Sequence, residues 1–293
     1  MRVSDNMSID TVSRNIAGAE ARQLAASREA SSGARINAPS DDPVGAAHLA
    51  RIQASIDTTA SFRQTISTVQ GDVALSESTL ASASSVMDRA QEIAMQGAND
   101  SLSASDRASL ATEVSSLREQ LISLANTKGS FGYLFGGTAN AAPPFDTTGA
   151  FVGNSNPHTV EIAPGLTLDT QVDGAKAFTL AGGRDVFADL TALSTALNAN
   201  DGAAVSATVN SLDTSRRQIV AARSDAGDKL NRLATADTVH DQVDSALQSQ
   251  RHDLADADPA ASYSRLMTAQ QSLTSAISVA RTTLNALGGA RFT

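Results

Sequence analysis

The chain contains no cysteine and no tryptophan, and aromatic residues make up only 3% of its 293 residues. The absence of cysteine excludes both a disulfide framework and thiolate catalysis. Hydrophobic residues reach 41%, but many of them are alanine, which favours helix and contributes little core volume. We therefore expect thin helical packing instead of a thick globular core.

The chain also lacks a basic block and a long apolar run. Its net charge of −9 argues against binding of nucleic acid or of an anionic membrane through a broad basic face. No segment approaches the roughly 18 consecutive apolar residues of a membrane span, so we expect no membrane insertion. Residues 1–17 alternate polar and apolar side chains, unlike the continuous apolar stretch of a cleaved secretory signal.

What the chain does have is an amphipathic stripe at each end. The N-terminal stripe comprises Ile9, Val12, Ile16, Ala19, Gln23 and Ala26, and the C-terminal stripe comprises Tyr263, Leu266, Gln270, Leu273, Ile277, Ala280, Leu284 and Leu287. This 3-4 spacing is typical of coiled-coil packing and requires a partner, either the other terminus or another molecule. We favour another molecule, and predict a self-assembly interface at the large apolar residues: Ile9, Val12, Ile16, Tyr263, Leu266, Leu273, Ile277, Leu284 and Leu287.

Clusters of proline, glycine and aspartate separate the terminal stripes from the rest of the chain. Asp41 and Asp42 lie between Pro39 and Pro43, where a turn and a helix cap are more plausible than a catalytic carboxylate pair. A similar cluster spans residues 253–259. We predict five segments: an N-terminal assembly helix and breaker (1–43), the first half of a helical bundle (44–135), a small β-rich insert (136–184), the second half of the bundle (185–255) and a C-terminal assembly helix (256–293).

Heptad patterns predict the buried faces of the bundle helices. One runs through Ile66, Val69, Val73, Ser76, Leu80, Ala83, Met87, Ala90 and Ala94, and a second through Leu110, Val114, Leu117, Leu121 and Leu124. In the insert, alternation predicts strands around Val160 and Leu168, and further strands around Val172 and Phe178 beyond an Asp173-Gly174 turn. The predicted fold class is mainly α, an elongated antiparallel helical bundle with a small inserted β domain and two terminal coiled-coil-like helices.

No motif in the sequence points to catalysis. The four histidines are His48, His158, His240 and His252, and they form no metal-binding pair at helical spacing. We expect all four to be solvated. There is no Gly-x-Ser-x-Gly elbow and no phosphate loop. The sequence therefore predicts no catalytic, cofactor or metal site and indicates that the protein is not an enzyme.

Three segments carry a resemblance to a known family. Residues 32–43, Ser-Gly-Ala-Arg-Ile-Asn-Ala-Pro-Ser-Asp-Asp-Pro, resemble the signature that follows the first helix of the bacterial flagellin family. Residues 87–100 resemble its second shared block, and residues 256–287 resemble its C-terminal segment. Residues 129–145 resemble the members at the hook–filament junction more than the filament flagellins. We define the signature turn by Gly33, Arg35, Asn37, Asp41, Asp42 and Pro43.

The resemblance implies a structural subunit of the bacterial flagellum that forms a junction ring between hook and filament by self-association of its terminal helices. It also implies an extracellular location, reached through the flagellar type III apparatus without a cleaved signal. The implied partners are copies of the chain in a ring, the hook and other hook-associated proteins, flagellin, and an export chaperone bound to the C-terminal helix. The alternatives are a filament flagellin and a cytoplasmic coiled-coil adaptor.

The narrow terminal stripes also bear on whether the terminal helices are folded before assembly. A narrow stripe buries little apolar surface, whereas ordering the backbone costs about 1–2 kcal/mol per residue. We therefore expect the terminal helices to become ordered on assembly.

Overall fold

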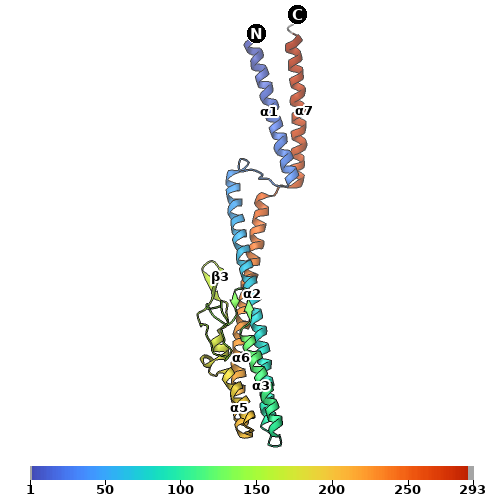
Figure 1. Ribbon diagram of the computed structural model, residues 1–293. Helices are drawn as coiled ribbons and strands as arrows, with labels where there is room; N and C mark the ends of the chain where they lie inside the picture. The colour runs from blue at the N-terminus through green and yellow to red at the C-terminus, as the bar shows by residue number, and fades with distance from the viewer. Residues whose placement is uncertain (1, 290–293) are drawn as a thin grey trace. The chain divides into compact units, whose positions relative to one another are not determined.

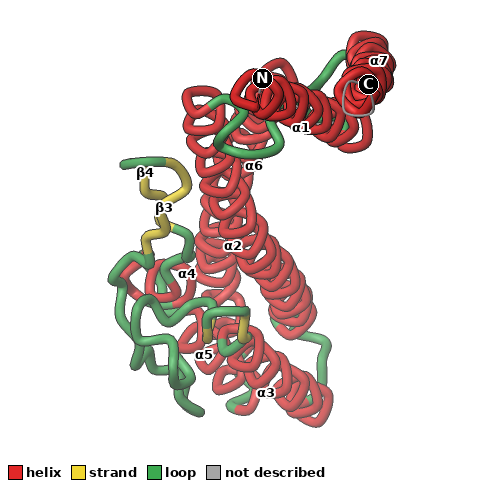
Figure 2. Tube along the Cα trace, turned by 90° about the horizontal axis from the view of Figure 1, so that it is seen from above, coloured by secondary structure: helices red, strands yellow, loops and turns green. Residues whose placement is uncertain are grey.

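The computed structural model describes residues 2–289, without the side chains of residues 2–6, 8, 284 and 286–289. Long helices dominate (Figures 1 and 2): α1 (Arg2–Ser32), α2 (Pro43–Gly97), α3 (Ala104–Ala125), α5 (Val186–Asn198), α6 (Gly202–Ala255) and α7 (Pro259–Gly289). The remaining helical segments are the short α4 (Gly174–Phe178) and a 3-10 turn at Leu180–Gly182. The predicted mainly-α class is confirmed.

Within residues 2–289, four short strands form two separate antiparallel pairs. Strand β1 (Lys128–Gly129) pairs with β2 (Gly132–Tyr133), and β3 (Thr159–Ala163) pairs with β4 (Leu166–Asp169). In the second pair Val160 lies opposite Leu168, and the tight turn uses Gly165 at a φ of 73°. This positive φ suits glycine, which has no side chain to strain the backbone. The strands predicted around Val160 and Leu168 are confirmed.

The described chain divides into two compact units. The terminal unit contains the residues up to Thr59 and those from Val243 onward, and the bundle unit contains residues 60–242. Helices α2 and α6 each contribute to both units. The predicted division into five segments places its boundaries elsewhere, in the breakers and at the ends of the insert, and stays a prediction.

The bundle unit buries the heptad patterns that the sequence predicts. Every residue of the first pattern, Ile66 to Ala94, is 3% exposed or less. In α3, Val114 and Leu121 are fully buried, and Leu110, Leu117 and Leu124 are half-buried against the core. Ion pairs tie α6 to α2 beside this core: Arg63–Asp237, Glu77–Arg223 and Asp88–Arg216.

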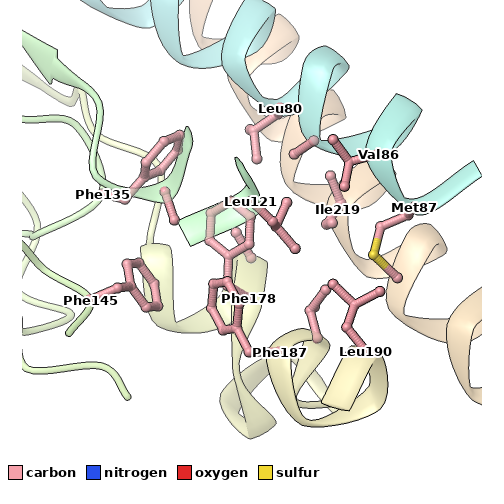
Figure 3. Packing of buried hydrophobic residues seen from close by; sticks show 14 of the residues in the cluster. Leu80, Val86, Met87, Leu121, Phe135, Phe145, Phe178, Phe187, Leu190 and Ile219 are labelled. Atoms are coloured by element: carbon pink, nitrogen blue, oxygen red, sulfur yellow. The ribbon is translucent and has the colours of Figure 1, made fainter. Parts of the chain in front are cut away.

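Phenylalanines close the core on the side of the insert (Figure 3). The Phe178 ring meets the rings of Phe135 and Phe145 edge-on, at centroid distances of 5.5 Å in both cases. Phe187 at the start of α5 lies 5.4 Å from Phe145. Edge-to-face contacts suit the ring quadrupole and add to the gain from burial. The few aromatic residues of the chain are thus concentrated where the insert joins the bundle.

The strands predicted around Val172 and Phe178 are wrong. Asp173 does not begin a hairpin turn, because its carboxylate accepts from the backbone N–H groups of Ala175 and Lys176 and caps α4. An aspartate at an N-cap satisfies amide groups that the first helical turn leaves free. Phe178, whose position suggested a strand, is therefore buried as part of the short helix α4.

The expectation that all four histidines are solvated is also wrong. His240 is only 8% exposed; its ring stacks on Phe62 at 5.5 Å, and its Nε2 donates to the carbonyl of Ile162 over 2.7 Å. His158 is half-buried, with its ring near Phe131 and its Nδ1 near the hydroxyl of Thr170. His240 is thus a core residue with a satisfied ring nitrogen, which connects α6 to β3.

Candidate self-assembly surface and signature turn

Helices α1 and α7 pack against each other in antiparallel orientation (Figure 1). Arg265, near the start of α7, forms an ion pair with Glu29, near the end of α1. Small side chains line the contact, where Ala19, Ala26, Ser262 and Ala280 are 8% exposed or less. Each terminal helix therefore has the other as a partner within the chain, which was the option that the sequence favoured less.

The predicted N-terminal stripe is the face of α1 that meets α7. Val12 and Ile16 are half-buried, and Ala19 and Ala26 are buried. Ile9 remains 39% exposed. The contact thus rests mainly on alanine, which lets two helices approach closely but buries little apolar area.

The predicted C-terminal stripe is divided between two faces of α7. Leu266 and Leu273 are half-buried towards α1, whereas Tyr263 and Ile277 are 66% and 37% exposed. The buried line keeps the stripe members Leu266, Leu273 and Ala280, which follow one another at seven-residue intervals, and it adds Ser262, which the predicted stripe lacks. The backbone of Leu284 and Leu287 belongs to α7, but their side chains lie outside the described part of the structure.

The exposed members of this stripe form a surface that the sequence alone did not delimit. Met267 is 59% exposed and follows Tyr263 by four residues, so the two lie on the same face of α7. Ile277 lies further along that face. We call Tyr263, Met267 and Ile277 the exposed α7 face. The (i, i+4) spacing of Tyr263 and Met267 was the signal in the sequence that could have identified it.

A groove of about 430 Å³ lies beside the α1–α7 contact. Its lining includes the small residues Ala25, Ala26 and Ala269 and the charged residues Arg22, Glu29 and Arg265. The described residues contain no group of three side chains suited to hold a metal ion. No helix in the described range is both long and apolar enough to cross a membrane. The features of this region suit packing against another helix.

The signature turn connects α1 to α2 through a compact set of hydrogen bonds. Gly33 ends α1 at a φ of 68°, a value that favours glycine. The carboxylate of Asp41 accepts from the N–H groups of Asn37 and Ala38 over 3.1 and 2.8 Å. Asp42 caps α2 by accepting from Gly45 N–H over 2.8 Å, and Pro43 is the first helical residue. The turn and cap predicted for the two aspartates are confirmed.

The signature turn also contacts the segment of residues 253–259 between α6 and α7, which lies far away in the sequence. Ala34 and Asp256 form an antiparallel bridge, in which Arg35 N–H donates to Ala255 and Ala257 N–H donates to Gly33. The pKa of the Asp42 carboxyl lies below its usual value, chiefly because of the bond from Gly45 and also because of Arg35. The structure thus brings Arg35, Asp42 and the end of α6 together, which local sequence patterns did not predict.

Comparison with known proteins shows that nearly the whole chain is similar to flagellar proteins. Residues 3–139 match the family of the bacterial flagellin N-terminal helical region. Flagellar hook-associated protein 3 of Salmonella typhimurium is 30% identical over 285 residues, covering 88% of this chain and 89% of that protein. The Escherichia coli protein of the same name is 28% identical over 300 residues, covering 93% and 94%. A solved structure described as a flagellar hook-associated protein from Vibrio parahaemolyticus aligns at a TM-score of 0.69 and 25% identity, covering 74% of this chain and 100% of that one.

Proposed function

This chain belongs to the family of flagellar hook-associated protein 3, and we propose that it is a structural subunit at the junction between hook and filament of the bacterial flagellum. The observation that carries the proposal is the extent of the match, 88% of this chain and 89% of the Salmonella typhimurium protein. A match of this length supports a shared role of the whole chain and not of one helical region alone. The exposed α7 face suits packing against another protein chain. We propose that the subunit acts without catalysis or cofactor.

We place the self-association surface on the terminal helices. The α1–α7 contact buries small side chains, while the exposed α7 face leaves Tyr263, Met267 and Ile277 in solvent. Large apolar side chains gathered on one exposed face mark a contact surface. We propose that this face packs against other copies of the chain in a ring. The hook, other hook-associated proteins and flagellin would then contact the edges of the ring.

Export is the second part of the proposal. We propose that the chain leaves the cell through the flagellar type III apparatus without a cleaved signal and resides in the extracellular part of the flagellum. An export chaperone would bind α7 before secretion. The exposed α7 face supports this idea, because an apolar helical face binds readily in the groove of a helical partner. The same face would then pass from the chaperone to neighbouring subunits.

The experiment that tests the proposal changes the exposed α7 face without disturbing α1. Tyr263→Asp combined with Ile277→Asp places two charges on that face. The control combines Ser275→Asp with Thr282→Asp, which adds the same charge at exposed positions about a third of a turn away from Tyr263 on the same helix. Each gene replaces the chromosomal copy, and the amount of the chain in sheared flagella is measured by quantitative mass spectrometry.

We expect the Tyr263/Ile277 variant to be absent from flagella and the cells to lose motility, whereas the Ser275/Thr282 control should be incorporated as in the wild type. Circular dichroism of the purified chains checks that both variants keep their helix content. Normal incorporation of the Tyr263/Ile277 variant would contradict the assembly surface. Retention in the cytosol without secretion would instead point to the chaperone contact of the same face.

A filament flagellin is the alternative within the same superfamily. The two roles differ in copy number, because a junction ring holds few subunits whereas the filament contains most of the protein mass of a flagellum. The mass-spectrometric measurement on wild-type flagella therefore separates them. A chain that equals or exceeds the main filament protein in abundance would exclude the junction role.

A further inference from the structure

We propose that Arg35 is a latch that joins the beginning of α2 to the end of α6 and thereby fixes the direction in which α1 and α7 leave these helices. The latch consists of Arg35, Asp42, Leu254 and Ala255. All four residues lie in the terminal unit. The inference concerns the isolated chain and does not depend on where in a flagellum it is placed.

Arg35 makes contacts with two different helix ends. Its backbone N–H donates to the carbonyl of Ala255 over 2.7 Å, and its Nη2 donates to the carbonyl of Leu254 over 2.9 Å. These carbonyls belong to the last two residues of α6, and the final carbonyls of a helix have no amide partner within the helix. The positive guanidinium also opposes the negative end of the α6 dipole. One residue thus supplies donors to the carbonyls of the last two residues of α6.

The other arm of the guanidinium reaches the beginning of α2. Nη1 of Arg35 lies 3.3 Å from Oδ2 of Asp42, whose Oδ1 accepts from Gly45 N–H. The negative carboxylate faces the positive end of the α2 dipole. Because the guanidinium is planar with several fixed donors, it can hold the carboxylate and the Leu254 carbonyl together. A lysine at this position has a single ammonium group for both.

Gly45 provides independent support for a built contact. A Cβ at Gly45 would lie 2.4 Å from Oδ2 of Asp42 and 2.6 Å from Cδ1 of Ile36. Glycine in a helix normally destabilises it. At this position glycine instead leaves the space that the capping carboxylate needs to reach Arg35.

The backbone bridge between Ala34 and Asp256 supplies only two hydrogen bonds. Two peptide hydrogen bonds leave the connecting segments free to pivot, whereas the side chain of Arg35 adds a third and a fourth point of attachment. The latch therefore fixes the angle at which α1 and α7 leave α2 and α6, which the Ala34–Asp256 bridge alone would leave variable. Because the Arg35–Asp42 pair is partly exposed, salt screens it, so the latch is adjustable and not permanent.

The test measures the distance between α1 and the first part of α2 in the full-length chain. The chain has no cysteine, so Ala21→Cys with Ala50→Cys introduces the only labelling sites, both at exposed positions. Nitroxide labels at these sites report a distance distribution by pulsed electron paramagnetic resonance. Dilution with unlabelled chain removes distances between molecules. We expect one narrow distribution for the latched chain.

Arg35→Ala should broaden this distribution, and Arg35→Lys should give an intermediate width because one ammonium group cannot serve both helix ends. Arg28→Ala is the matched control, since it removes the same charge from an exposed position of α1. Gly45→Ala should also broaden the distribution although alanine favours helix. Its control, Gly71→Ala, lies in the same helix, where an added Cβ meets nothing within 4 Å, and should leave the distribution unchanged.

Circular dichroism establishes that each variant keeps its helices. A narrow, wild-type distribution for Arg35→Ala would overturn the latch, and so would a broad distribution for the unsubstituted chain. A wild-type distribution for Gly45→Ala alone would overturn the part assigned to Asp42. Because the measurement uses dilute monomer, these outcomes are independent of whether the chain assembles at a junction.

Discussion

Arg107 donates from Nη1 to Oδ1 of Asn200 over 2.5 Å, so a buried guanidinium in α3 holds the turn between α5 and α6. The same side chain donates to the carbonyls of Gly97 and Asn99 over 2.9 and 2.8 Å. Arg107 thereby completes the C-terminus of α2 and joins it to a turn about a hundred residues later in the sequence. Arg107 thus connects three segments at this end of the bundle.

Arg107→Ala should reduce the stability of the bundle by about 3 kcal/mol, because it leaves buried carbonyls without donors. Arg107→Lys should recover only part of this loss, since an ammonium group cannot match the fork of three acceptors. Urea denaturation followed by circular dichroism measures both. Arg217→Ala is the control, because that side chain is 74% exposed and should change stability by less than about 0.5 kcal/mol. Equal midpoints for Arg107→Ala and the control would contradict this role.

Two glycines of α2 should respond in opposite directions to alanine. Gly71→Ala should stabilise the chain by about 0.5–1 kcal/mol, because alanine loses less backbone entropy and its Cβ has free space. Gly97→Ala should destabilise it by about 1–3 kcal/mol through overpacking, since the new Cβ would lie 2.4 Å from Cδ2 of Leu197. Thermal unfolding of both variants, compared with the wild type, checks the sign of each change.

Phe178 should be the most sensitive residue at the contact between insert and bundle. It is fully buried among Phe135, Phe145 and Phe187, so Phe178→Ala should cost about 3–5 kcal/mol. Phe178→Leu keeps more of the volume and should cost less. Hydrogen exchange resolved by segment is the measurement, with faster exchange expected in α4 and α5. Unchanged protection there in Phe178→Ala would show that the aromatic cluster does not hold the insert.

Asp42 should make the signature turn sensitive to acid. Its pKa is lowered from 3.8, first by the hydrogen bond from Gly45 and further by Arg35. A lowered pKa in the folded state means that the contribution to stability is complete above the unfolded value and is lost as pH falls through the folded one. The turn should therefore loosen only below about pH 4. Titration of the Asp42 carboxyl by NMR measures this pKa, and Arg35→Ala should raise it.

The terminal helices of the monomer should be the first targets of a protease. Their contact buries alanine and leaves Ile9, Leu24 and Tyr263 exposed, so local opening should be cheap. Limited proteolysis should then remove residues before about 40 and after about 258 while the bundle unit survives. Mass spectrometry of the fragments identifies the cuts. Resistance at both ends would instead indicate that the α1–α7 pair opens no more easily than the bundle unit.

In the bundle unit, a local sequence pattern is enough to predict which face of α2 is buried. The pattern from Ile66 to Ala94 repeats on one face of a helix, and any partner that buries that face must bury these residues. The same reasoning fails for Asp173-Gly174, because an aspartate before glycine suits a hairpin turn and a helix cap equally well. Only the contacts of Phe178 with Phe135 and Phe145 select the helix at this point.

For this protein, the sequence by itself determined the long helices, the breakers between them, the β3–β4 hairpin and the resemblance to the flagellin family, because each depends on residues close together in the chain. Only the tertiary structure decided which face of α7 meets α1, that His240 is buried, and that Arg35 reaches the end of α6. These contacts join residues that are distant in sequence. The small side chains along α1 and α7 allow either helix to rotate about its own axis and still pack at a similar distance from the other. Packing selects one of these rotations, and Tyr263 and Ile277 remain exposed as a result.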